Sequence, residues 1–368
     1  MKDPLLHSTL LAVSMVAAGC SSTISPSDPT DIGSWAVAYG VPGVAVAVIR
    51  DFDVAYVEVH GVMDRATGEP VTERTLFQAA SLTKSVSASG VLRLAQEHAV
   101  DLDTDVNDYL SSWKVPDNDL QRSERVTLRR LLSHTAGTTV SGFRGYRYTE
   151  PVPTLLQVLT GAPPANSPPV VVDLVPGTEW RYSGGGYEIA DLVVREVTGQ
   201  SFPEFIREQV LAPVGMEHST FEQPLPDSLR HLAPTGHYAD GTPVPGGHHI
   251  YPEIAAAALW TTAEDMARFL IEVQRSLRGE ANRVLDQSHT ELLVTEVEND
   301  YGLGLFLWSI EGQPYFGHYG ANDGFRSRMV AHLSGGWGAV VLTNSDRGHE
   351  FADAVIGVIG EREGWPGF

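Results

Sequence analysis

The chain has 368 residues, of which 42% are hydrophobic and 19% are charged, so it can bury a core and general disorder is excluded. Its formal net charge of −21 argues against binding to nucleic acid and against docking on anionic lipid headgroups, because both need a basic surface. A chain of this length is expected to form one large domain or two ordinary ones.

The N-terminal residues have the pattern of an export signal. Residues 5–18 form an apolar stretch that ends at small residues before Cys20, the single cysteine of the chain. The stretch is too short to span a bilayer but fits the apolar region of a signal peptide. Small residues directly before a cysteine resemble a bacterial lipobox, in which that cysteine carries lipid. We therefore predict a signal peptide over residues 1–20, lipidation of Cys20, and a flexible tether over residues 21–30.

This pattern departs from a lipobox at two positions. Asp3 offsets the positive charge near the N-terminus, and Ala17 stands where leucine is usual. An ordinary cleaved signal peptide or a frayed N-terminus is the alternative. Either signal predicts an exported protein of the periplasm or cell envelope, with the membrane involved only through a lipid on Cys20.

The remaining chain alternates between strand and helix patterns. Apolar runs at 44–49 and 54–59 around a short polar turn predict a β-hairpin. Helical spacing follows at 81–97, 128–132, 189–197, 202–210 and 263–276. Strand patterns return at 303–307, 314–317, 325–332 and 339–342, before a final helix at 351–359.

Strands at both ends with helices between them predict an α/β (α+β) fold whose sheet is built from both termini. We expect one domain over residues 31–368. Its sheet lobe takes residues 31–80 and 295–368, and a mostly helical inserted lobe takes residues 81–294. The boundary between the two lobes is a favoured place for a pocket.

The tetrad Ser81-Leu82-Thr83-Lys84 has the context that nucleophilic catalysis needs. It lies where the strand-like residues 75–80 give way to a helical pattern, and residues three apart share one face of a helix. The Lys84 amine can therefore lie beside the Ser81 hydroxyl, which becomes a nucleophile when an adjacent base takes its proton. Backbone N–H groups at the start of the helix favour developing negative charge.

A second Ser-x-x-Lys match, at residues 111–114, shows that the pattern alone is weak. Lys114 lies just before Pro116 in a polar stretch and lacks the strand-then-helix context of Lys84. We take this second match as chance.

Tyr182 is a second candidate for acid–base chemistry. It lies in the glycine-rich residues 176–187 ahead of a helix, so its hydroxyl can be presented in a cleft. A phenol held near cations has a lowered pKa and can exchange protons with a serine and a leaving group. A structural turn with Tyr182 as a half-buried anchor is the alternative.

The run His318-Tyr319-Gly320-Ala321 follows the apolar start of a strand. A strand edge here could line the cleft, and the Ala321 N–H could pair with that of Ser81 as an oxyanion hole. Gly320 would let a substrate approach closely. A lone histidine is more often structural, so this element is weak by itself.

Taken together and in this order, Ser-x-x-Lys, Tyr-x-Gly and His-x-Gly resemble the penicillin-recognising serine hydrolases. That superfamily includes class C β-lactamases, D,D-peptidases and family VIII esterases. The resemblance covers residues 31–362 and extends to the segments 77–80, 131–137, 176–178, 259–265 and 317–325.

The resemblance implies a β-lactamase-like fold with an antiparallel sheet flanked by helices. It also implies acylation of Ser81, acid–base work shared by Lys84 and Tyr182, and an oxyanion held by the backbone N–H groups of Ser81 and Ala321. Which of Lys84 and Tyr182 is the general base stays open, because coupled groups titrate as a unit.

Two substrate-binding positions depart from the β-lactamase pattern. Gly184 stands where those enzymes usually have an asparagine that binds the acylamido group, and His318 and Tyr319 replace a Lys-Thr pair that attracts a carboxylate. These losses should weaken binding of anionic amides by a few kcal/mol. Arg326 or Arg328 is a candidate replacement charge, with a solvated strand face as the alternative. The departures favour an esterase or broad acyl hydrolase, with a D,D-peptidase or weak β-lactamase as the alternative.

Other chemistries lack their motifs. The chain has no G-x-S-x-G, H-E-x-x-H, C-x-x-C or P-loop pattern, so no cofactor or metal is expected. His248-His249 is a candidate metal pair, but adjacent residues rarely converge on one ion and a Pro/Gly-rich loop predicts solvent exposure. The expected partner is a small-molecule ester, peptide or β-lactam. A non-catalytic relative that binds cell-wall peptides is the remaining alternative.

Overall fold

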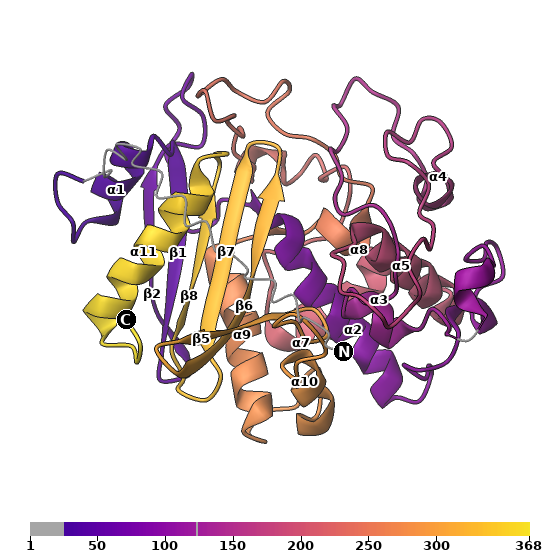
Figure 1. The fold of residues 1–368 in the computed structure, drawn as a ribbon. Coiled ribbons are helices and arrows are strands. Elements are labelled where there is room, and N and C mark those ends of the chain that lie inside the picture. The colour runs from indigo at the N-terminus through magenta and orange to yellow at the C-terminus, as the bar shows by residue number, and fades with distance from the viewer. Residues whose placement is uncertain (1–25, 123) are drawn as a thin grey trace, which may run out of the picture.

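The computed structural model describes residues 26–122 and 124–368 (Figure 1). The predicted signal peptide, Cys20 and the first part of the predicted tether lie outside the described residues. Within the described ranges, no helix combines the length and apolarity that crossing a membrane requires.

A six-stranded antiparallel sheet forms the centre of the fold, with strand order β2-β1-β8-β7-β6-β5 (Figure 1). Its strands are β1 (Gly43–Arg50), β2 (Asp53–Gly61), β5 (Phe306–Ile310), β6 (Gln313–Asn322), β7 (Phe325–His332) and β8 (Gly338–Thr343). The N-terminal hairpin joins the C-terminal strands through β1 and β8, which place Val46 opposite Val341. The prediction of an antiparallel sheet built from both termini is confirmed.

Strand β1, which lies next to the edge strand β2, is buried on both faces, and its residues alternate between two hydrophobic clusters. Val44, Val46 and Val48 pack on the face covered by α1 (Ile32–Tyr39) and α11 (Gly348–Glu363). The intervening residues Ala45, Ala47 and Ile49 belong to the larger cluster on the other face. There α9 (Ala263–Leu277) lies against the sheet, beside α10 (Gln287–Leu293) and α2 (Thr83–Gln96).

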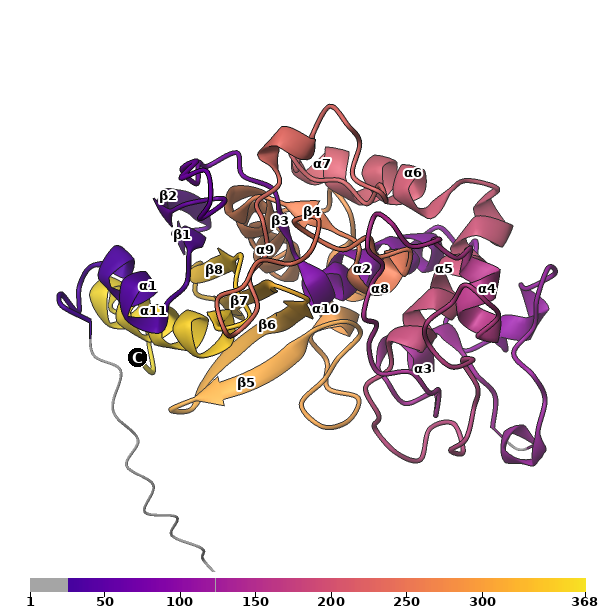
Figure 2. The same ribbon diagram turned by 90° about the horizontal axis from the view of Figure 1, so that it is seen from above.

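Most of the remaining helices gather beyond the β6 side of the sheet, with α2 between them and the strands, whereas α7 (Ala212–Val214) packs on α9 (Figures 1 and 2). The others are α3 (Leu128–Leu132), α4 (Leu155–Thr160), α5 (Gly184–Thr198), α6 (Phe202–Ile206) and α8 (Ile254–Ala257). A π-helical turn, Arg207–Leu211, joins α6 to α7. A two-stranded ladder of β3 (Phe77–Gln78) and β4 (Trp260–Thr261) connects the start of α2 to the segment after α8.

Among the differences from the sequence predictions, two element boundaries and one lobe assignment have a clear physical reason. Helix α5 begins at Gly184 instead of residue 189, because Ser183 Oγ caps it by accepting the Gly186 N–H at 3.0 Å. Strand β6 continues to Asn322 because β7 pairs with it along its whole C-terminal half. Helix α9, which the sequence assigned to the helical lobe, packs against β1, β2 and β8 and thus forms part of the layer that covers the sheet.

Candidate active site

Ser81 lies in a single 3₁₀ turn, Ala80–Leu82, directly before α2. The buried Ala80 has a φ of +51°, a left-handed conformation that costs free energy in a non-glycine residue and recurs at functional sites. Hydrogen bonds on both sides of Ala79 hold the turn. The Ala79 N–H donates to Leu259 O at 2.9 Å, and Ser327 Oγ donates to Ala79 O at 2.7 Å. The partly exposed Ser81 is therefore fixed against both the sheet and the loop after α8.

Lys84 is buried beneath Ser81, one helical turn further along. Its Nζ donates to Ser81 Oγ at 3.1 Å and to Ala256 O at 2.8 Å. Burial lowers the Lys84 pKa from 10.5 to about 7, while the nearby Glu188 carboxylate opposes that change. An amine with a pKa near 7 can be neutral at the working pH and can accept the proton of Ser81.

Small polar side chains along α2 explain why this helix packs so closely on α8. Ser87 Oγ donates to Ala255 O at 2.9 Å, and Thr83 Oγ1 accepts the Leu259 N–H at 3.1 Å. These bonds satisfy backbone groups that would otherwise be buried without partners. They also place Ala256 O where it receives Lys84 Nζ.

Tyr182 completes the cluster at Ser81. The Lys84 Nζ atom lies 5.0 Å from the centroid of its ring, and its phenol interacts with the Ser81 side chain. Burial raises the Tyr182 pKa above its ordinary value of 10, so the prediction of a lowered phenol pKa is wrong. The phenol lies too deep for a phenolate to be solvated, and the nearby amine is itself easily neutralised. Tyr182 therefore keeps its proton at neutral pH.

His134 supports Tyr182 and was not predicted as a site residue. Its Nδ1 accepts the Ser183 N–H at 3.1 Å, and its ring centroid lies 4.2 Å from that of Tyr182. Its backbone has a φ of +63°. Burial holds its pKa well below 6.5, so the ring is neutral and can accept this hydrogen bond. The only sequence signal for it was its place in residues 131–137, which resemble the superfamily.

Strand β6 brings His318 and Gly320 to the same side as Ser81. His318 is 1% exposed, donates from Nδ1 to Tyr319 O at 2.6 Å and accepts at Nε2 from the Tyr301 hydroxyl at 3.2 Å. Burial and the Lys84 charge lower its pKa to about 3, so it is a neutral group. It cannot replace a lysine as a fixed positive charge for a substrate carboxylate.

Gly320 shows how tightly β6 packs on the segment that carries Ser81. A Cβ at this position would lie 2.3 Å from Ala79 O and 2.0 Å from Ser327 Oγ, so only glycine fits. Strand β5 pairs with β6 only as far as Gly317, which leaves the following β6 edge to face the 79–81 segment. Ala321 follows on this part of β6, and its N–H as the second oxyanion donor stays a prediction.

Tyr319 lies on the opposite face of the sheet, because adjacent strand residues point to opposite sides. The Arg328 guanidinium lies 4.0 Å from the Tyr319 ring centroid and 2.9 Å from Asp353 on α11. Arg326 is paired with Asp346 at 2.7 Å. Tyr319 therefore does not line the cleft, and neither arginine supplies the replacement charge considered from the sequence.

Gly184 begins α5 and has no room for a side chain. A Cβ there would lie 2.8 Å from Phe143 Cε2 and 3.3 Å from Ser141 O. The Phe143 ring thus fills the place that an asparagine would need. Where β-lactamases usually have an asparagine amide, this chain therefore has the Phe143 ring beside Gly184.

Two weaker sequence matches lie outside this site. In the second Ser-x-x-Lys match, Lys114 Nζ donates to Asn107 O at 2.7 Å and both ends of the tetrad are exposed. The expected exposure of His248 and His249 is wrong, since they are 8% and 4% exposed. Tyr148 and Arg144 O occupy one nitrogen of each ring. Across residues 26–122 and 124–368, no group of three or more His, Cys, Asp or Glu side chains could hold a metal ion.

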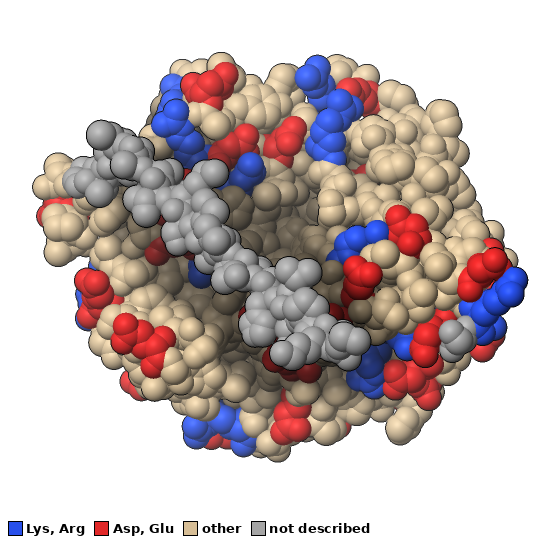
Figure 3. Space-filling view, in the orientation of Figure 1, with Lys and Arg blue, Asp and Glu red and all other residues tan. Residues whose placement is uncertain are grey.

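The face of the molecule seen in Figure 3 is hollowed between the sheet and the helices beyond it, near the N-terminal end of α2. The wall of this hollow is drawn mostly in tan, and the coloured Lys, Arg, Asp and Glu residues lie mainly around its rim (Figure 3). The hollow therefore offers a substrate a largely uncharged surface.

Comparison with known proteins agrees with this geometry. Residues 29–361 match the family described as Beta-lactamase. The chain is 29% identical over 353 residues to "Penicillin-binding protein 4" of Amycolatopsis lactamdurans, covering 88% of this chain and 86% of that protein.

Two solved structures share the fold. A penicillin-binding protein homologue from Pyrococcus abyssi, described as octameric, superposes with a TM-score of 0.75 at 22% identity, covering 90% of this chain and 75% of that one. A D-amino acid amidase from Ochrobactrum anthropi superposes with a TM-score of 0.73 at 23% identity, covering 91% and 98%. At these identities the likeness concerns the fold.

Proposed function

Because this chain belongs to the beta-lactamase family of penicillin-recognising serine hydrolases, we propose that it hydrolyses neutral esters through an acyl-enzyme on Ser81. The observation that carries the catalytic part is the buried Lys84 amine, 3.1 Å from Ser81 Oγ and with a pKa lowered to about 7. An amine of this pKa is a competent base at neutral pH.

In the proposed acylation step, neutral Lys84 takes the Ser81 hydroxyl proton while Oγ bonds to the substrate carbonyl carbon. The carbonyl oxygen becomes an oxyanion facing the backbone N–H groups of Ser81 and Ala321. When the ester C–O bond breaks, the leaving alkoxide takes the Tyr182 proton, and the Lys84 ammonium returns a proton to Tyr182. The raised pKa of Tyr182 supports this division of labour, because a protonated phenol donates and does not act as the first base.

Deacylation repeats the sequence with water in place of serine. Water loses a proton to the same base, its oxygen bonds to the acyl carbon, and Ser81 Oγ leaves with a proton. The products are a carboxylic acid and free enzyme, so no cofactor is consumed.

The preference for neutral substrates rests on what lines the site. His318 is neutral and fully engaged by Tyr301 and its neighbour's carbonyl. Gly184 offers no amide, and Phe143 presents an aromatic edge there. A substrate carboxylate would thus be desolvated without a fixed cation to pair with, which is costly. An uncharged ester carries no such penalty.

A peptidase acting on D-amino acid peptides or amides is the second candidate. It is favoured by the 29% identity to a penicillin-binding protein over most of both chains. The esterase is expected to prefer uncharged substrates and the peptidase substrates with a carboxylate. Substrates that differ only in this charge therefore distinguish the two candidates.

The test offers purified protein a p-nitrophenyl butyrate, a p-nitrophenyl hemisuccinate, a chromogenic cephalosporin and a D-Ala-D-Ala peptide. Ser81→Ala is the matched variant, and mass spectrometry locates the acyl group. We expect acylation of Ser81 and at least tenfold higher kcat/KM for the butyrate than for its anionic analogue. Unchanged turnover in Ser81→Ala would contradict the enzyme proposal, and preference for the anionic ester or the peptide would favour the peptidase.

We also propose that the protein is exported and carries lipid on Cys20, a residue outside the described part of the chain. The support is the apolar stretch followed by small residues and cysteine. Metabolic labelling with a palmitate analogue in a bacterial host tests it. Label in the wild-type chain and not in Cys20→Ser is expected, and equal labelling of both would contradict lipidation at this residue.

A further inference from the structure

A buried carboxyl group lies behind the base and has no role in the steps above. Glu188 is on α5, six residues after Tyr182, and is 0% exposed. Its Oε1 accepts the N–H of Ala256 at 3.0 Å. The carbonyl of the same residue, Ala256, accepts Lys84 Nζ at 2.8 Å. A single residue of α8 thus connects the carboxyl group to the catalytic amine.

The second oxygen of this carboxyl group, Oε2, is buried with no hydrogen-bond partner in the described part of the chain. A buried carboxylate without full hydrogen bonding is expensive to retain. A leucine here would pack in the same core at no such cost. The retained carboxyl group therefore calls for an electrostatic explanation.

The other titratable groups that face Lys84 are uncharged, so they do not stabilise a charge on its amine. His134 and His318 face it from the α3 side and from β6, and burial keeps both rings neutral by lowering their pKa. Tyr182 and Tyr187 face it from the α5 segment, and burial raises the pKa of both phenols.

Around Glu188, Asp191 and Arg195 on the same helix form an ion pair. Glu253, in the segment before α8, is buried, and its pKa is raised to about 8, so at neutral pH it is mostly protonated. Burial, together with the nearby Asp191 and Glu253, raises the pKa of Glu188 well above 4.5. In its carboxylate form Glu188 raises the pKa of the Lys84 amine against the effect of burial.

We propose that Glu188 is a positioning residue for the Ser81–Lys84 pair, acting in two ways through one contact. It fixes the Ala256 peptide that holds Lys84 Nζ within reach of Ser81 Oγ. In its carboxylate form it also stabilises the ammonium that forms when Lys84 takes the Ser81 proton. The proposal rests on the proposed function, in which Lys84 is the base.

Substitutions of Glu188 separate positioning from charge. Glu188→Gln keeps an oxygen that can accept the Ala256 N–H but removes the charge. Glu188→Asp keeps the charge, but its side chain is one methylene shorter, so the carboxylate lies further from the Ala256 N–H. Glu188→Ala removes both. Because Glu188 does not touch substrate, KM for a neutral ester should stay within about threefold in all three variants.

The decisive readout is the pH profile of kcat/KM with p-nitrophenyl butyrate. Without the negative charge, the ammonium form of Lys84 is less favoured, so the acid limb of Glu188→Gln should move down by about 1 pH unit. Its plateau should fall about tenfold, because a weaker base accepts the serine proton less readily. Glu188→Asp should keep the wild-type acid limb with a lower plateau. Glu188→Ala should show the shifted limb and a fall of about 100-fold.

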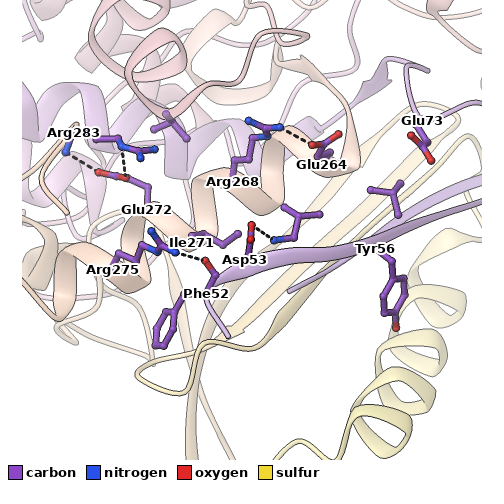
Figure 4. Close-up of a pocket in the computed structure, with 13 residues that line it drawn as sticks. Phe52, Asp53, Tyr56, Glu73, Glu264, Arg268, Ile271, Glu272, Arg275 and Arg283 are labelled. Carbon is purple, nitrogen blue, oxygen red and sulfur yellow. Dashed lines mark hydrogen bonds and ion pairs between the residues drawn. The ribbon is translucent and has the colours of Figure 1, made fainter. Parts of the chain in front are cut away.

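Glu272 provides a matched control. It is a 5% exposed glutamate on α9 whose Oε1 accepts the Arg283 N–H at 2.8 Å. It lines a surface hollow beside β2, at the edge of the sheet opposite to β6 and Ser81 (Figure 4). Glu272→Gln should lose stability without moving the acid limb.

Several results would overturn the proposal. One is a wild-type acid limb and plateau in Glu188→Gln, and another is the same shift in Glu272→Gln. If Glu188→Gln does not fold, as judged by circular dichroism, Glu188→Asp provides the test because it retains the charge. A displaced acid limb in Glu188→Asp would then count against the charge role. Failure of wild-type protein to acylate Ser81 would instead refute the proposed function, so the two failures are distinguishable.

Discussion

Lys84 is expected to act against the stability of the fold while it serves the reaction. Burial lowers its pKa from 10.5 to about 7, which corresponds to about 5 kcal/mol of unfavourable free energy when the amine is charged. We predict that Lys84→Met abolishes esterase activity but raises the free energy of unfolding. Methionine fills a similar volume without a charge, although it leaves Ala256 O without its partner at a cost of about 1–3 kcal/mol. The net gain near pH 6 should be about 2–4 kcal/mol.

The dependence of this gain on pH identifies its cause. In the unfolded chain the lysine stays protonated up to about pH 10.5, whereas in the folded protein it releases its proton near pH 7. The unfolded state therefore binds more protons between these values, and the penalty is full below pH 7 and disappears as the pH rises toward 10.5. The advantage of Lys84→Met over wild type should shrink by about 2 kcal/mol between pH 6 and pH 8.5.

Urea unfolding followed by circular dichroism at several pH values measures this difference. Lys114→Met is the matched control, because Lys114 is an exposed lysine in the second Ser-x-x-Lys tetrad. Its effect should be small, within about 1 kcal/mol, and independent of pH. A Lys84→Met protein that is less stable than wild type at pH 6, or whose advantage does not change with pH, would refute the reasoning.

The remaining predictions concern two glycines of the site. Gly320→Ala should inactivate the enzyme and lower the thermal midpoint, because its Cβ would lie 2.3 Å from Ala79 O and push the Ser81 turn away from β6. Gly357→Ala on α11, where a Cβ meets nothing within 4 Å, should instead stabilise by about 0.5–1 kcal/mol. If Gly320→Ala and Gly357→Ala changed the thermal midpoint and the ester hydrolysis rate equally, this account would be contradicted. Gly184→Asn should destabilise by about 1–3 kcal/mol through contact with Phe143, and Phe143→Ala in the same chain should relieve that effect. An additive loss in the double variant would show that the two positions do not compete for space.

Much of the fold could be predicted because its signals are local. The nearly continuous apolar run of Val, Ala and Ile along β1 is typical of a strand that is buried on both faces. Helix α3 and strand β7 match their predicted bounds, and the Thr127 cap at the start of α3 is a signal that can be read within a few residues. The start of α5 was missed because three glycines suggest a loop, and only the Ser183 cap reveals the helix.

The arrangement of the candidate catalytic residues was also predictable, for a related reason. Ser81 and Lys84 are three residues apart at the start of a helix, so local geometry brings them together. Tyr182 was named from the resemblance, and the structure places it against both. The direction of its pKa was predicted wrongly, because desolvation depends on atoms from several distant segments that a sequence does not order in space.

The sequence by itself determined that Ser81 and Lys84 lie side by side and that the sheet is made from both ends of the chain, because each follows from periodicity or short spacing. Tertiary structure alone decided which charges reach the site. It turned Tyr319 and Arg328 to the far face of the sheet, neutralised His318 by burial, and brought Glu188 behind Lys84 through Ala256. Burial and pairing are properties of packed neighbours far apart in the chain, and they set the electrostatics around Ser81.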